Sequence, residues 1–267
     1  MPHVALLALC VLVPLVAALL SSREVRAWLR GTGSIRQTLS NAGVGVLFLI
    51  TQLLLRGTLI AVFAGLAALV PYKLPDHAWW SYAVAFLLLD LVYYVQHRLE
   101  HAVPLLWAIH AVHHQSNDYN LSVSFRVGVL ASLSTLCFHG LLALAGVSVT
   151  QYAAVITVHA VILFTLHART RFTVGPGLLF NAPVFHRVHH AADAGYIDRN
   201  FGGVLLVFDR LFGTFAPYQG EPTYGVAGER SPENPVAANV APFEALARSL
   251  RAQPTLARKA RALFIRA

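Results

Sequence analysis

Long apolar runs separated by short polar segments dominate this chain. There are five such runs: Val4 to Leu20, about Leu39 to Val70, Trp79 to Gln96, about Val127 to Ala145, and Val147 to Leu166. The last two are separated by little more than Gly146, which predicts a tight turn between two helices. Because about 20 apolar residues carry a helix across a bilayer, we predict an all-α, polytopic membrane bundle of four to five spans.

Basic residues fix the expected orientation of this bundle. The segments after the first, third and fifth runs hold Arg23 to Arg36, Arg98 to Arg126, and the chain from Arg169 onward. The opposite loops hold little beyond Lys73, so the positive-inside rule places the basic segments in the cytosol. The first run is predicted to be a retained helix, because a signal peptide carries its positive charge before the apolar stretch.

The composition supports a membrane protein. The 267 residues are 57% hydrophobic and 12% charged, against about 45–50% and about 25% in soluble domains. A net charge of +8 raises nucleic-acid binding as a possibility, but the basic residues form no dense face, so no nucleic-acid partner is expected. Cys10 and Cys137 lie inside apolar runs and are expected to be buried, which leaves no thiolate metal site.

The pattern divides the chain into three parts. We expect an N-terminal transmembrane helix with a basic loop at 1–36, a membrane-embedded catalytic domain at 37–240, and a basic amphipathic tail at 241–267. In the tail, leucines alternate with arginines, and Pro254 interrupts the pattern. A helix on an anionic lipid surface and a solvated tail both remain open.

Thirteen histidines are unusual in so apolar a chain, and eight of them form three short groups. The groups are HRLEH with His97 and His101, HAVHH with His110, His113 and His114, and HRVHH with His186, His189 and His190. Residues at i, i+3 and i+4 share one side of a helix, so we expect each group to aim its rings in one direction. We therefore expect the three groups to converge and to bind metal.

The number of ligands argues for two ions. Eight imidazoles exceed the four to six positions of one ion, and clustered histidines gain little from packing alone. All three groups fall on the predicted cytosolic side, in segments too polar to be embedded. We therefore expect a helical histidine-box cap at the cytosolic face of the bundle.

The other histidines have different expected roles. His167 ends the fifth apolar run on the cytosolic side and is predicted to be a ninth ligand. His159 lies deeper, where packing or support of a ligand is expected, and His139 is expected to be hydrogen-bonded inside the bundle. His3 and His77 fall on the far side and are expected to play no part.

Two further side chains are candidates for catalytic roles. Asp90 is the one acid deep in an apolar run and lies seven residues before His97, on the same helical face. A buried carboxylate needs a partner, and we expect Asp90 to accept the second ring N–H of a ligand histidine. Tyr94 shares this face and is either a hydrogen-bonding residue of the pocket or a tyrosine at the membrane interface.

Several other readings of these motifs remain open. HRLEH matches the HxxEH signature of zinc hydrolases, with Glu100 as general base, but this leaves six histidines unused. A haem bundle uses one axial histidine from each of two helices rather than triplets. Imidazole alone does not select iron over zinc, so a dizinc hydrolase of lipid esters stays possible. A divalent-metal transporter would place its ligands at mid-membrane.

Two stretches resemble a known family. DLVYYVQHRLEHAVPLLWAIHAVHHQSNDYNLSVSFR and LFNAPVFHRVHHAADAGYIDRNFGGVLLVFDRLFGTF are similar to the fatty acid hydroxylase and sterol desaturase superfamily, over about half of the chain. The resemblance implies that the eight box histidines and His167 bind two iron ions. Members often carry another histidine one turn before this last position, where this chain has Leu163.

The resemblance also implies a reaction. Members use O₂ to hydroxylate or desaturate a C–H position of a lipid. DYNLS and YIDRNFGG look most like the alkylglycerol monooxygenase branch, which implies ether lipids and a reduced pterin. Neither a Rossmann fingerprint nor a CxxC motif is found, so the electrons are expected from a redox protein or a diffusible reductant.

Overall fold

The computed structural model describes residues 35–171, 173, 177–229 and 231–265. The predicted first span, Val4 to Leu20, lies outside these residues, as do Cys10 and His3. Within the described part the chain is helical and has two isolated β-bridges but no strand, as the all-α prediction requires. The elements are α3 (Ile35–Ala68), α4 (Trp79–Ala102), α5 (Pro104–His114), the 3₁₀-helix η1 (Leu121–Phe125), α6 (Ala131–Leu144), α7 (Val149–Leu166), α8 (Pro183–His189), α9 (Val207–Leu211), α10 (Pro235–Arg251) and α11 (Leu256–Phe264).

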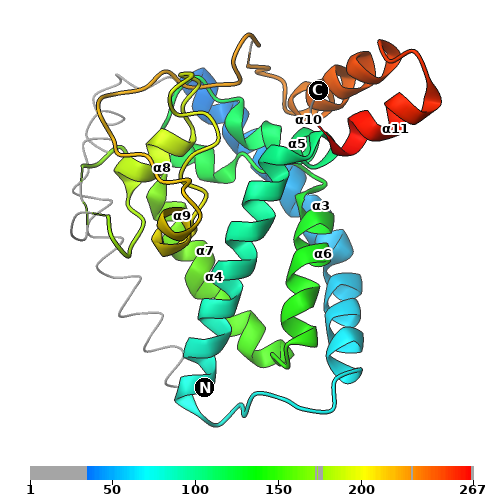
Figure 1. The fold of residues 1–267 in the computed structure, drawn as a ribbon, viewed down its shortest axis with the longest axis vertical. Coiled ribbons are helices and arrows are strands. Elements are labelled where there is room, and N and C mark those ends of the chain that lie inside the picture. Colours follow the sequence, from blue (N-terminus) through cyan, green and yellow to red (C-terminus); the bar gives the residue numbers. More distant parts are fainter. Residues whose placement is uncertain (1–34, 172, 174–176, 230, 266–267) are drawn as a thin grey trace.

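Four long helices form the bundle. Helices α3, α4 and α6 run beside one another along the long axis of the molecule, and α7 also packs against α4 (Figure 1). Small residues at the contacts, such as Ala85 and Ala143, let the backbones approach closely, while Phe63, Leu89 and Leu142 fill the space between them. This apolar core holds the bundle together along most of its length.

The connection between α6 and α7 is the predicted tight turn. Gly146 has a φ of +86°, a conformation that favours glycine, and Ser148 begins α7. The Ser148 hydroxyl accepts the amide N–H of Gln151, whose side chain accepts the Ser148 amide N–H in return. The turn therefore reverses the chain within a few residues, and both helices pack on α4.

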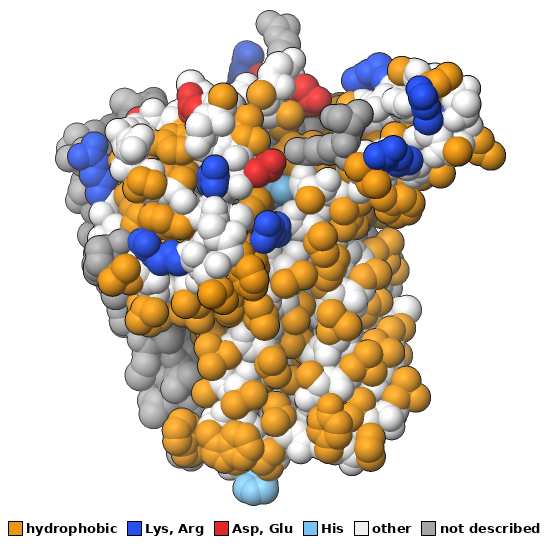
Figure 2. All heavy atoms as spheres, viewed as in Figure 1, with side chains coloured by type: hydrophobic (Ala, Val, Ile, Leu, Met, Phe, Trp, Pro, Cys, Tyr) orange, Lys and Arg blue, Asp and Glu red, His pale blue; other side chains and the backbone are white. Residues whose placement is uncertain are grey.

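The outer surface of the bundle is strongly apolar. Among the described helices, α3 and α7 are long and apolar enough to cross a membrane, and α6 is a shorter apolar helix. Figure 2 shows hydrophobic side chains over the lower part of α3, α4 and α6, whereas acidic and basic side chains gather at the upper end. Cys137 of α6 is exposed, so the prediction of a buried cysteine is wrong there.

The remaining elements gather at the end of the bundle opposite the loop between α3 and α4 (Figure 1). Only Val103 separates α4 from α5, and Pro104 begins the new helix because its missing N–H costs nothing at this position. Pro183 begins α8 in the same way. Helices α10 and α11 flank Pro254, the residue predicted to interrupt the tail. This end of the bundle carries the nine histidines predicted as ligands.

Candidate metal centre

All nine histidines predicted as ligands lie together in two groups. The first group is His97, His101, His110, His114 and His189; the second is His113, His167, His186 and His190. In each group, one ring nitrogen from every residue lies within 4.8 Å of the others. The rings of His114 and His190 stack with centroids 4.4 Å apart, which places the two groups side by side.

The histidine boxes on α5 and α8 each divide between the two groups, unlike the single direction expected from the sequence. On α5, His110 and His114 belong to the first group and His113 to the second. On α8 and the residue that ends it, His186 and His190 belong to the second group and His189 to the first. Each HxxHH box thus contributes histidines to both groups instead of one.

The sharp reversal after α4 brings the first group together. His97 and His110 are 13 residues apart in sequence, yet their Nε2 atoms are 3.1 Å apart. His101 and His114 have the same sequence separation and an Nε2 to Nε2 distance of 3.2 Å. Two residues one helical turn apart on α4 thus face two residues one turn apart on α5.

Backbone carbonyls hold the second ring nitrogen of several of these histidines. His97 Nδ1 lies 2.9 Å from Phe201 O, and His113 Nδ1 lies 3.0 Å from Arg126 O. His167 Nδ1 lies 3.1 Å from Leu163 O, and His189 Nδ1 lies 2.9 Å from Arg199 O. A carbonyl oxygen only accepts hydrogen bonds, so each Nδ1 must carry the proton. Each Nε2 therefore presents a lone pair to the cluster.

These lone pairs face one another at short range, which a bound cation would explain. The Nε2 atoms of His113 and His167 are 3.2 Å apart although both rings donate through Nδ1. Two nitrogens that bind one ion at about 2.1 Å and at right angles lie about 3 Å apart. The Nε2 atom of His189 is buried with no hydrogen-bond partner among the described residues. The donor set fits divalent transition-metal ions.

Burial keeps these imidazoles in the form that binds metal. Desolvation lowers the pKa of His113, His114, His186, His189 and His190 well below the usual histidine value, and neighbouring histidines lower each pKa further. Neutral imidazole is the ligand form of histidine, so the cluster is prepared for metal at neutral pH.

The metal-free protein should lose stability as the pH falls below about 6.5, the usual histidine pKa. Below that pH the unfolded chain binds protons, whereas the folded chain does not, because the pKa values of its buried imidazoles are lowered. The free energy of unfolding should therefore decrease on acidification. Thermal midpoints of chelator-treated protein at neutral and mildly acidic pH measure this, and a midpoint that rises on acidification would contradict it.

Two carboxylates orient histidines of the first group. Asp198 Oδ1 lies 3.1 Å from His101 Nδ1, and Glu100 Oε2 lies 3.1 Å from His110 Nδ1. The other oxygen of Glu100 accepts hydrogen bonds from Gln96 and Ser134, at 2.9 and 2.6 Å. Glu100 is therefore engaged on the outer side of a histidine ring, which disfavours its role as general base in a zinc hydrolase.

The contacts of Asp90 differ from the expectation. Its carboxylate lies 2.9 Å from His159 Nε2 and accepts the backbone N–H groups of Val204 and Leu205 at 2.7 and 2.9 Å. The predicted hydrogen bond from a ligand histidine to Asp90 is therefore wrong. Asp90 and His159 instead anchor a loop from much later in the chain, inside the bundle.

Asp209, which the sequence reasoning missed, anchors the same loop from its other side. Its carboxylate accepts the backbone N–H groups of Phe201 and Gly202 at 2.8 and 2.7 Å and the Thr214 hydroxyl at 2.7 Å. The 199–205 loop, held between Asp90 and Asp209, carries the carbonyls of Arg199 and Phe201 that orient two histidines of the first group. The sequence feature that could have singled out Asp209 is its place as an acidic residue inside the apolar run LLVFDRLF.

This loop needs its glycines for close approach. A Cβ on Gly203 would lie 2.6 Å from Asp90 Oδ1 and 2.8 Å from His159 Nε2. A Cβ on Gly202 would lie 2.4 Å from Leu205 O. The NFGG sequence therefore lets the loop enter the bundle and reach the two acids.

Tyr94, His139 and His77 belong to neither histidine group. Tyr94 is buried, its hydroxyl is 3.0 Å from Thr214 Oγ1, and its ring stacks on Phe212. His139 Nδ1 lies 2.8 Å from the Tyr152 hydroxyl, which confirms the hydrogen bond predicted inside the bundle. His77 is exposed in the loop between α3 and α4, at the opposite end of the bundle.

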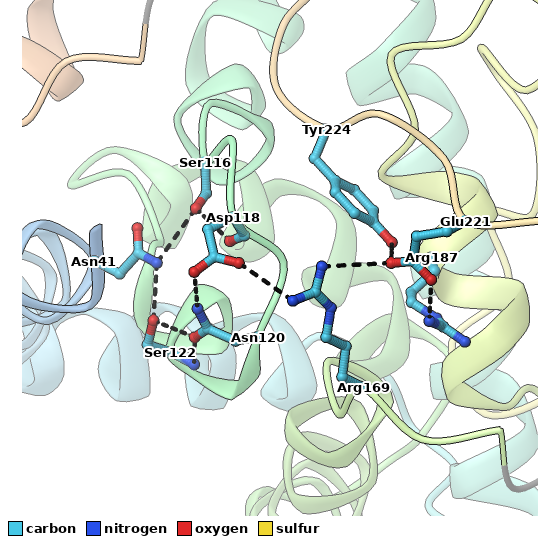
Figure 3. A network of polar contacts seen from close by, with 9 residues as sticks. All are labelled: Asn41, Ser116, Asp118, Asn120, Ser122, Arg169, Arg187, Glu221 and Tyr224. Carbon is cyan, nitrogen blue, oxygen red and sulfur yellow. Dashed lines mark hydrogen bonds and ion pairs between the residues drawn. The ribbon is translucent and has the colours of Figure 1, made fainter. Parts of the chain in front are cut away.

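A polar network lies around Glu221, which two arginines and a tyrosine contact (Figure 3). Arg187, between two histidines of α8, is buried and donates to Glu221 at 2.7 Å, and the Tyr224 hydroxyl donates to the same carboxylate. Arg169 lies within ion-pair distance of both Glu221 and Asp118. The network therefore ties α8 to the segment that follows His167.

Comparison with known proteins agrees with this geometry. The fatty acid hydroxylase family model matches residues 82–214, which include all nine histidines. The chain belongs to the fatty acid hydroxylase family, so the resemblance seen in its histidine boxes is confirmed. No solved structure matches the chain significantly.

The curated relatives extend this assignment. Alkylglycerol monooxygenase of Danio rerio is 33% identical over 207 residues, 76% of this chain and 46% of the relative. The Homo sapiens alkylglycerol monooxygenase is 32% identical over 220 residues, 80% and 49% of the two chains. The ornithine lipid hydroxylase OlsE of Rhizobium tropici is 29% identical over 140 residues, which are 51% of this chain and 42% of the relative. The chain thus spans about half the length of the curated relatives it matches.

Proposed function

We propose that this chain is a membrane-bound non-haem di-iron oxygenase, which uses O₂ and external electrons to hydroxylate or desaturate a C–H position of a lipid. The convergence of nine imidazoles, seven of them buried and two half-buried, in two adjacent groups carries the proposal. Family membership adds the reaction type, and the relatives named above are a monooxygenase and a lipid hydroxylase.

In this proposal each histidine group holds one iron ion. The first ion would be held by His97, His101, His110, His114 and His189, and the second by His113, His167, His186 and His190. When bound, the two ions supply O₂ activation and the oxidising power needed to attack an unactivated C–H bond.

The protein's own residues prepare the site for this chemistry. Carbonyls of Arg199 and Phe201 and the carboxylates of Glu100 and Asp198 fix the ligand rings, so little reorganisation is needed on metal binding. The Trp107 ring lies 5.0 Å from the His101 ring and helps to exclude water. Asp90 and Tyr94 act in this proposal by positioning the surrounding loop and helix, not by touching the reacting atoms.

The proposed setting is a bundle of four to five spans with the histidine-bearing end in the cytosol. The apolar outer surface and the charged upper end support this placement, which lets a lipid chain reach the site from the bilayer. Ether lipids are the proposed substrates because of the alkylglycerol monooxygenase relatives. The proposed electron donor is a reduced pterin or a redox protein.

Oxygen-isotope labelling tests the proposal. Full-length protein loaded with ferrous iron would receive ¹⁸O₂, a reductant and mixed lipids that include alkylglycerols. We expect either a lipid product that has gained one ¹⁸O atom, or one that has lost two hydrogens, together with O₂ uptake. Cleaved lipid esters without O₂ uptake would instead establish the dizinc hydrolase.

His77→Ala is expected to leave lipid oxidation and metal content unchanged. His77 is exposed at the end of the bundle that lies opposite the nine histidines, so its loss removes no ligand and no buried contact. Metal analysis and product formation beside the unmodified protein check this. A loss comparable to that of a ligand variant would contradict the assigned location of the site.

A further inference from the structure

Helix α11 has an exposed apolar face. Leu256, Ala260 and Phe264 follow one another at intervals of four residues and therefore lie on one side of the helix. Leu256 is 83% exposed and Phe264 is 60% exposed, and no described residue of α11 is buried. Contiguous large apolar side chains at a protein surface indicate an interaction site.

The other side of α11 is basic. Arg258 lies on the face opposite Ala260, and Lys259 and Arg261 lie at the two flanks. The sequence from Ala245 to Ile265 contains no acidic residue. An apolar face with arginine and lysine around it is typical of helices that lie in the plane of an anionic membrane surface.

The position of α11 in the fold fits such a surface. Figure 1 shows α10 and α11 projecting sideways from the bundle, at the end where α5 lies. In Figure 2 the apolar surface of α3 and α6 extends up to this projection, which itself carries basic side chains. Helix α11 contacts α5 and α10, and α5 carries three of the nine histidines. These contacts fix the position of α11 along the bundle axis relative to the histidine groups.

We propose that α11 lies in the headgroup layer of the leaflet next to the metal centre and selects anionic lipid. Leu256, Ala260 and Phe264 face the acyl chains, while Arg258, Lys259 and Arg261 attract lipid phosphates. The apolar band of the bundle and the apolar face of α11 then form one continuous lipid-facing surface. This interaction does not depend on the oxidation chemistry.

A fluorescent probe on the apolar face tests the proposal. The full chain, with Cys10 and Cys137 changed to serine, receives Ala260→Cys and an environment-sensitive dye at that position. The protein is reconstituted into vesicles of phosphatidylcholine alone or with phosphatidylglycerol, each with and without brominated acyl chains. We expect emission at shorter wavelength and strong quenching by the brominated lipid, both larger with phosphatidylglycerol. A dye at exposed Ala227 is the control and should show neither.

Neutralising the basic residues tests the lipid preference. Each cation near an anionic leaflet favours docking about fivefold, so the triple variant R258Q/K259Q/R261Q should lower the docked-to-undocked ratio on the order of a hundredfold. Its quenching should become equal in the two vesicle types. Water-like emission from Ala260→Cys in both vesicle types would overturn the proposal. Equal quenching in both types before neutralisation would overturn the selection of anionic lipid.

Discussion

Replacing His189 or His113 by alanine is expected to lower lipid oxidation more than about a hundredfold, beyond the loss typical when only a residue supporting a metal ligand is removed. His189 Nε2 is buried in the first group with no partner among the described residues, and His113 belongs to the second group. Each substitution removes one ligand nitrogen from a different site. Product formation by mass spectrometry measures the effect, and each variant should retain its membrane insertion.

His139→Ala is the matched control for these substitutions. His139 is also a buried histidine, but its hydrogen bond goes to Tyr152 and it belongs to neither group. The His139→Ala variant should have lower thermal stability but should retain its metal content and its activity per folded molecule. If His139→Ala removed metal as the ligand variants do, burial and not ligation would explain the losses.

Asp209→Ala is expected to give a large loss of stability. Its carboxylate accepts two backbone N–H groups and one hydroxyl, all in a buried setting. Leaving buried donors unpaired costs about 1–3 kcal/mol each, so a total loss of roughly 3 kcal/mol or more is expected. Because the same loop orients His97 and His189, metal affinity should also fall, by roughly tenfold or more.

A thermal-unfolding series with and without added metal measures both effects. Glu233→Ala removes an exposed carboxylate and serves as the control, which should change neither quantity appreciably. Unchanged metal affinity in folded Asp209→Ala protein would show that the 199–205 loop does not set the ligand positions.

The sequence predicted which histidines lie together better than it predicted how they are arranged. Spacing of three and four residues showed that the boxes lie on helices, and the end of an apolar run singled out His167. The division of each HxxHH box between two groups was not predictable, because it depends on how α5 and α8 approach each other. A difference of one residue along a helix is enough to point His113 and His114 toward different groups.

The surroundings of Asp90 show a second limit. Helical spacing placed Asp90 near His97 on α4, but its partners, Val204 and Leu205, come from more than 100 residues later. Apolar runs also predicted α3 and α7 as span-length helices, since composition and length alone decide that property. They could not predict that Cys137 is exposed, because a uniformly apolar helix does not reveal which side faces the core.

Metal analysis of the full-length protein purified without oxygen tests the central claim most directly. Two groups of neutral imidazoles with facing lone pairs predict two iron ions per chain, lowered to about one when His113 or His189 is replaced, since each belongs to a different group. One ion per chain, no bound metal, or stoichiometric zinc without O₂ uptake would contradict the account.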